Sequence, residues 1–126
     1  MRFMIIRKAD PETEAGLMPS EELMSAMGEY NKEMAEAGVL LMGDGLRASS
    51  FGARVEFAGG SPTVTDGPFT ESKELIAGFS IIEVASKAEA VEWVRGWPVL
   101  DGGGSARIEL RQLFEPEDFA TENLSE

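Results

Sequence analysis

The sequence contains no cysteine and no histidine in its 126 residues. Without cysteine, the chain forms no disulfide, binds no metal through a thiolate and has no thiol nucleophile. Without histidine, it lacks the commonest general base near neutral pH and a frequent metal ligand. Any catalysis must therefore use carboxylates, lysine, hydroxyls, backbone groups or the single tyrosine, Tyr30.

Basic residues are also scarce, with 11 Lys and Arg against 23 Asp and Glu, which gives a formal net charge of −12. A nucleic acid or an anionic membrane repels such a surface, so we expect neither as a partner. The simplest interpretation of the charge is solubility.

Long apolar runs are missing as well. No stretch approaches the ~20 apolar residues of a membrane span, and the apolar run at the start of the chain is too short for a secretory signal. Together with the absence of cysteine, this predicts a protein of the reducing cytoplasm.

The length predicts a single domain over residues 1–126, with an acidic C-terminal tail from about residue 115. We expect this tail to dock through Phe119 and to fray after Thr121. Hydrophobic periodicity and turn residues divide the domain into strands and helices. We expect strands at 2–8, 39–42, 78–84 and 106–114, helices at 20–37 and 86–95, a loop at 9–19, an extended segment at 46–50 and a hairpin formed by 52–58 and 61–65.

This order of elements predicts an α+β fold, namely a ferredoxin-like split βαβ sandwich with an inserted β-hairpin. The first helix has Ser20 as an N-cap and Gly38 as its stop. The segment Gly43-Asp44-Gly45 is expected to interrupt the second strand as a bulge or kink. In the hairpin, Val55, Phe57 and Val64 are expected to form a buried face.

Two helices cover only one face of such a sheet. Strands 2–8, 39–42 and 78–84 nevertheless have apolar residues on both faces. An uncovered apolar face of several hundred Å² is unusual in a monomer. We therefore expect a homodimer in which the same face of a second copy provides the cover.

The densest cluster of turn residues and charge is DGPFTESKE at 66–74. Gly67 is expected to take a positive φ, and Pro68 fixes its own φ, so Asp66 is held on a stiff frame. Thr70 is a candidate cap for a short helical turn that begins near Glu71. The simpler interpretation is a tight loop with solvated charges.

The DGPF stretch resembles the motif of the YCII-related proteins. Further matching positions are Glu71, Lys73-Glu74, Gly78-Phe79, Gly38, Gly43-Asp44-Gly45-Leu46, Leu113-Phe114-Glu115 and Glu117-Asp118-Phe119. The resemblance extends over nearly the whole chain and implies a dimeric α/β barrel with clefts near the subunit contact. Some members carry a His-Asp pair with a proposed acid–base role, which this histidine-free chain does not have.

The resemblance implies that relatives act on small, often aromatic or lactone-like molecules, and it assigns the motif carboxylate to Asp66. The first hypothesis is therefore a small-molecule enzyme or its descendant, with no cofactor. Asp66 is the candidate base or ligand anchor, and two neighbouring carboxylates are able to divide acid and base roles. The candidate ligand-binding residues are Asp44, Arg47, Phe69, Glu71 and Lys73.

Two alternatives stay open. The family resemblance also implies a regulatory or partner-binding module associated with a sigma factor of the extracytoplasmic-function group, and an acidic surface suits a basic partner. A Mg²⁺ or Ca²⁺ ion on Asp44, Asp66 and Glu71 is the third hypothesis, although their spacing matches no known loop and surface charge explains them more simply.

Overall fold

The computed structural model describes residues 1–120, except for the side chain of Ser72. Single 3₁₀ turns η1 to η4 lie at Ser49–Phe51, Ser72–Glu74, Asp101–Gly104 and Pro116–Phe119. The longer elements are β1 (Arg2–Lys8), α1 (Pro11–Glu14), α2 (Glu21–Glu36), β2 (Leu40–Gly45), β3 (Ala53–Ala58), β4 (Ser61–Asp66), β5 (Ile76–Glu83), α3 (Lys87–Arg95) and β6 (Ile108–Gln112).

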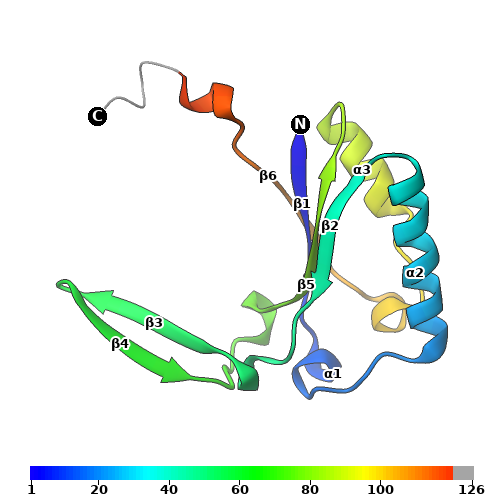
Figure 1. The fold of residues 1–126 in the computed structure, drawn as a ribbon. Coiled ribbons are helices and arrows are strands. Elements are labelled where there is room, and N and C mark those ends of the chain that lie inside the picture. The colour runs from blue at the N-terminus through cyan, green and yellow to red at the C-terminus, as the bar shows by residue number, and fades with distance from the viewer. Residues whose placement is uncertain (121–126) are drawn as a thin grey trace.

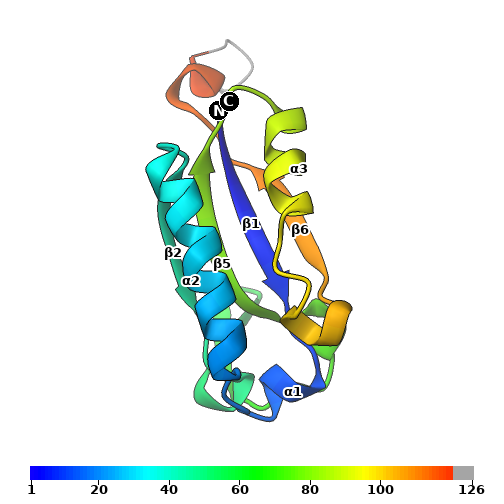
Figure 2. The same ribbon diagram turned by 90° about the vertical axis from the view of Figure 1, so that its right-hand side faces the viewer.

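The main sheet is antiparallel, with the strand order β2-β5-β1-β6. Helices α2 and α3 both lie against the same face of this sheet, and the other face is left without a helix (Figures 1 and 2). Strands β3 and β4 form a separate two-stranded sheet inserted between β2 and β5. The predicted ferredoxin-like fold with an inserted hairpin is confirmed.

The long helix α2 forms where its caps and its apolar stripe predict it. The Ser20 hydroxyl accepts a hydrogen bond from the Leu23 N–H at 3.1 Å, and Gly38 ends the helix with φ = +73°. The Tyr30 hydroxyl donates to the Trp93 carbonyl at 2.6 Å, which joins α2 to α3. Burial, followed by the nearby Glu33 charge, raises the pKa of Tyr30 to about 12, so this phenol stays protonated.

The core lies between the two helices and the covered face of the sheet. Every second side chain of β1 points toward the helices, and these side chains are almost fully buried. None of the helices within residues 1–120 combines the length and the apolar character needed to cross a membrane. The buried core consists of Phe3, Ile5, Tyr30, Met34, Val39, Ile82, Val84 and Ala90.

The opposite face of the sheet, called the open face below, is also apolar. The register pairs Met4 with Ile81 and Ile6 with Phe79, and Met42 lies beyond Ile81 on β2. The first four side chains are only half-buried and Met42 is exposed. No helix of the described residues packs on them, as Figure 1 shows.

The strands expected at 78–84 and 106–114 are shifted or shortened to Ile76–Glu83 and Ile108–Gln112, and two connecting segments contain helical turns that the sequence did not predict. The expected loop at 9–19 contains the short helix α1, because Asp10 and Thr13 form a reciprocal capping box and Pro11 occupies the first turn. The expected extended segment at 46–50 ends in the turn η1.

Gly43 and Gly45 do not interrupt β2. The strand runs through them, and the irregularity in the ladder lies earlier, between Leu40 and Met42. A Cβ on Gly43 would lie only 2.9 Å from the Ser80 hydroxyl and 3.2 Å from the Phe79 carbonyl oxygen. Gly43 therefore accommodates the close approach of β5, and the predicted bulge at this position is wrong.

The hairpin forms as predicted across Gly59 and Gly60, whose φ angles of +58° and +88° fit a two-residue hairpin turn. Its expected burial is wrong for the single chain. Val55, Phe57 and Val64 are 53%, 71% and 65% exposed. Figure 1 shows the reason, since the hairpin projects away from the main sheet and contacts it only at its base.

The C-terminal segment was expected to dock through Phe119, and this is wrong for the single chain. Phe119 packs on Phe114, with ring centroids 4.9 Å apart, but both rings are more than half exposed. The segment is held instead by the Arg2 Nε–Glu115 ion pair at 3.1 Å. The predicted fraying after Thr121 lies outside the described residues.

Candidate functional site

The DGPF motif forms a loop that is pressed against the turn η1. The Gly67 N–H donates to the Gly52 carbonyl at 3.0 Å, and the Gly67–Pro68 peptide bond is cis. A Cβ on Gly67 would lie 1.8 Å from the Ser49 carbonyl oxygen. The φ of Gly67 is not positive, so the prediction on that point is wrong. Glycine is required here because another backbone segment occupies the space of a side chain.

Ser49 connects the motif to the start of the chain. Its hydroxyl accepts a hydrogen bond from the Phe69 N–H at 3.0 Å and donates one to the Glu14 carboxylate. The Ser49 N–H donates to the same carboxylate at 3.0 Å. One serine therefore joins the DGPF loop, η1 and α1.

Phe69 and Glu71, two of the predicted site residues, meet at Arg54 on the hairpin. The Arg54 guanidinium lies 3.9 Å from the centroid of the Phe69 ring and 3.4 Å from a Glu71 oxygen. The backbone N–H of Glu71 and then the Arg54 guanidinium hold the pKa of the Glu71 carboxyl below its usual value. Because this ion pair is exposed, it contributes little stability, and its main effect is to orient the base of the hairpin.

A cleft of about 370 Å³ opens beside Ser49. Among the described residues that line it, Arg47 provides the one cationic group, a guanidinium that lies 3.8 Å from the centroid of the Phe51 ring. The cleft is within the size range of small-molecule sites. Its lining consists of Glu14, Leu46, Arg47, Ala48, Ser49, Phe51, Gly52, Leu75 and Ile76.

The remaining predicted site residues do not line this cleft. Asp66 ends β4 opposite Ala53, next to the cleft-lining Gly52. Asp44 lies on β2 in register with Phe79. Lys73 is exposed in the turn η2. Within residues 1–120, no three acidic side chains gather in a way that would hold a metal ion, so Asp44, Asp66 and Glu71 do not form the ion site considered above.

Sequence reasoning missed Glu14, Ser49 and Phe51. Glu14 and Ser49 are 35 residues apart, and neither lies in a motif, so no local signal connects them. For Phe51, an aromatic residue four positions after Arg47 was a weak sequence signal of the stacked pair that the structure shows.

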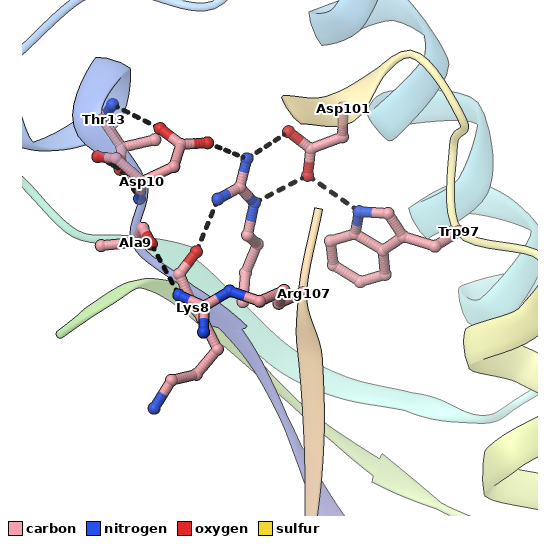
Figure 3. Close-up of polar contacts among 8 residues, drawn as sticks. Lys8, Ala9, Asp10, Thr13, Trp97, Asp101 and Arg107 are labelled. Carbon is pink, nitrogen blue, oxygen red and sulfur yellow. Dashed lines mark hydrogen bonds and ion pairs between the residues drawn. The ribbon is translucent and has the colours of Figure 1, made fainter. Parts of the chain in front are cut away.

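A second polar cluster, also missed, is buried at the end of β1. Arg7 and Asp101 are each 8% exposed and form a bidentate pair, with Nε–Oδ2 at 2.9 Å and Nη2–Oδ1 at 2.8 Å. The Trp97 indole N–H donates to Asp101 at 2.8 Å, and Arg7 also donates to Asp10 at 3.0 Å (Figure 3). Asp10 is also the N-cap of α1 and accepts a hydrogen bond from the Thr13 N–H. The network therefore connects η3, β1 and α1.

Burial acts to raise the pKa of Asp101, but the hydrogen bonds from Arg7 and Trp97 and the Arg7 charge together hold it below its usual value. The carboxylate is therefore ionised and fully engaged with the protein. A second cleft of about 360 Å³ lies beside it. Because its one charged lining group is already paired, we assign this cluster a structural role.

The two clefts differ in what they offer a ligand. The one beside Ser49 combines apolar walls with a guanidinium at the surface, and Arg groups of this kind pair with carboxylates and other planar anions. The Glu14 carboxylate already accepts hydrogen bonds from the N–H and the hydroxyl of Ser49. The geometry therefore suits the binding of an organic molecule with one anionic group.

Comparison with known proteins places the chain among relatives of similar size. It is similar to the uncharacterized protein R00369 of Rhizobium meliloti (strain 1021), with 33% identity over 100 residues, which cover 79% of this chain and 81% of the relative. It also resembles the solved 5-chloro-2-hydroxyhydroquinone dehydrochlorinase (TftG) of Burkholderia phenoliruptrix AC1100, in complex with 2,5-dihydroxybenzoquinone. That likeness is loose, with 19% identity and a TM-score of 0.41 over 94% of this chain and 98% of the other.

The model of the YCII-related domain matches residues 1–113 and includes every element of the main sheet, both long helices, the hairpin and the DGPF loop. The resemblance seen in the motif thus extends over almost all of the described structure. The chain is a member of the YCII-related domain family.

Proposed function

We propose that the protein acts as a homodimer and binds a small organic molecule with an anionic group in the cleft beside Ser49. The observation that carries this proposal is the construction of the cleft wall. The family motif holds η1 through Gly67 and through the Phe69–Ser49 hydrogen bond. The most characteristic loop of the chain therefore shapes the wall that presents Arg47.

The open face supports the dimer. Met4, Ile6, Phe79 and Ile81 form a continuous apolar surface over the two central strands, and the helices leave it uncovered (Figure 1). A second copy related by a two-fold axis covers such a face most simply. The cleft lies at the end of the sheet where β2 ends and β5 begins, so it lies beside this contact.

We assign Asp66 the role of ligand anchor at the rim, and of base if the bound molecule is transformed. It lies opposite Ala53, one residue after the cleft-lining Gly52. Arg47 is the assigned anion-binding group. Asp44, on the open face, is the second carboxylate that such acid–base chemistry would use.

A thermal-shift screen of small phenols, lactones and organic acids tests this proposal. Arg47→Gln is expected to weaken a hit by about tenfold or more, because one charge-assisted hydrogen bond is lost. Asp66→Asn should weaken the same hit. Arg95→Gln is the matched control, because Arg95 is an exposed arginine that pairs only with Glu92 in the described contacts. Equal binding by all three variants would contradict the assigned site.

The screen also bears on the alternative of a binding module. No shift with any compound, combined with an intact dimer, would favour a protein partner such as the sigma factor that the family resemblance suggests. The net charge of −12 suits a basic partner surface.

A further inference from the structure

We propose that, in the dimer, the hairpin of each copy packs on the C-terminal segment of the other. This inference rests on the homodimer proposed above. The hairpin arm is defined as residues 53–66 and the C-terminal arm as residues 113–120. Both carry apolar side chains that their own chain leaves exposed.

One face of the hairpin arm, called the held face, contacts the DGPF loop, and the opposite face, called the free face, is exposed. Arg54, on the held face, contacts Phe69 and Glu71 at the base of the arm. The free face carries the facing pair Val55 and Val64, with Phe57 and Pro62 beyond it. Because an isolated two-stranded hairpin is marginally stable in water, this free face requires cover from outside the chain.

The C-terminal arm presents a second uncovered surface. Phe114 and Phe119 pack only on one another among the described aromatic contacts, and they are 69% and 55% exposed. Glu115 fixes the arm by accepting hydrogen bonds from the Arg2 backbone and side chain. An aromatic pair on a fixed segment is typical of the anchor of an interface.

The two arms leave from opposite ends of the main sheet. Strand β2, which leads into the hairpin, and β6, which leads into the C-terminal arm, run in opposite directions. Both arms extend on the side of the open face, as Figure 1 shows. A second copy seated on the open face therefore lies between the two arms.

Charge decides how the copies are oriented. A two-fold axis parallel to the strands would bring the two C-terminal arms together, with Glu117 and Asp118 of each copy close to the same residues of the other. A two-fold axis perpendicular to the strands places the hairpin end of one sheet beside the C-terminal end of the other. Each C-terminal arm then meets a hairpin arm, and the repulsion between the two acidic arms is avoided. Each six-residue strand of the hairpin spans about 20 Å, which gives the arm the reach for this exchange.

The exchange also places Asp66 at the subunit contact. Asp66 lies two residues after Val64 on the same strand, so both side chains project from the free face. The second copy then closes the space between this carboxylate and the open face.

Cysteine cross-linking tests the exchange directly, because the chain has no cysteine of its own. Phe57→Cys and tagged Phe119→Cys chains are co-expressed and treated with a short bismaleimide. A covalent species of twice the chain mass that contains both variants is expected, and neither variant should cross-link by itself. Val99→Cys, at an 81% exposed position of another loop, replaces Phe119→Cys as the control and should give no product.

Three other outcomes overturn the proposal. Cross-links within each single variant, with none between them, would show that like arms meet. An intact dimer that gives no cross-link would show that the arms pack elsewhere, while the homodimer itself stands. A monomer in sedimentation would remove the homodimer and the exchange together.

Discussion

Replacing Asp101 with alanine is expected to lower the free energy of unfolding by about 3 kcal/mol. Arg7 then loses its bidentate partner and, among its described contacts, keeps only the Asp10 carboxylate and the Lys8 carbonyl. The Trp97 indole N–H also loses its acceptor. The two side chains are only 9% and 10% exposed, so solvent screens the pair weakly. Urea denaturation followed by far-ultraviolet circular dichroism measures this effect. Protein concentration must be fixed, because dimerisation couples stability to concentration.

Glu92→Ala is the control for this effect. It removes the exposed Arg95–Glu92 pair, whose side chains are more than 70% exposed, and should cost less than about 0.5 kcal/mol. The double variant Arg7→Met/Asp101→Leu should recover part of the loss, because it removes both charges of the buried pair. The recovery is partial because the Trp97 indole N–H still lacks an acceptor and Asp10 loses its contact with Arg7. A loss of less than about 1 kcal/mol in Asp101→Ala would contradict the account of this cluster.

The same pair gives the stability a defined dependence on pH. Burial acts to raise the pKa of Asp101, but Arg7 and Trp97 hold it below its ordinary value of 3.8. A depressed pKa in the folded state adds stability above the ordinary value, and this contribution is lost as the pH falls through the folded pKa. The wild-type protein should therefore lose stability more steeply below pH 3.8 than Asp101→Asn.

Gly67→Ala is expected to lower the free energy of unfolding by about 3 kcal/mol, because the added methyl group clashes with the backbone of η1. The new Cβ would lie 1.8 Å from the Ser49 carbonyl oxygen, which belongs to the backbone and has no rotamer that relieves the clash. The same urea titration measures the loss. Ligand binding should weaken in parallel, because η1 is displaced.

Gly45→Ala is the matched control for this substitution. A Cβ at Gly45 meets no atom within 4 Å, and its φ is not in the left-handed region. Its effect should stay within about 0.5 kcal/mol. If Gly67→Ala were as stable as Gly45→Ala, the close packing of the DGPF loop on η1 would be wrong.

The helices and strands could be predicted from sequence because their signals are local. Ser20 and Ser86 cap their helices through hydrogen bonds that span three residues, and the hairpin turn needs only Gly59 and Gly60. The short helix α1 was missed although its capping box is also local, because a four-residue helix has no apolar stripe to mark it.

The site was less predictable because its contacts join distant segments. A glycine at position 67 was explained by a positive φ, whereas the structure explains it by the Ser49 carbonyl, 18 positions earlier in the chain. No pattern in the sequence relates Ser49 to Glu14, or Arg7 to Asp101, which are 94 residues apart. A charged residue such as Arg7 can be assigned to a buried ion pair only when its partner is known.

The hairpin shows a different limit. Its alternation predicted an apolar face correctly, but alternation does not say which molecule covers that face. In the single chain, Val55, Phe57 and Val64 remain exposed. The proposed dimer accounts for both the hairpin and the open face with one symmetry operation.

Sedimentation velocity at micromolar concentration tests the homodimer most directly. The wild-type protein should sediment at twice the 13.6 kDa mass of one chain. Ile6→Glu, which places a charge in the centre of the open face opposite Phe79, should sediment as a folded single chain. A wild-type protein that sediments at 13.6 kDa would contradict the account.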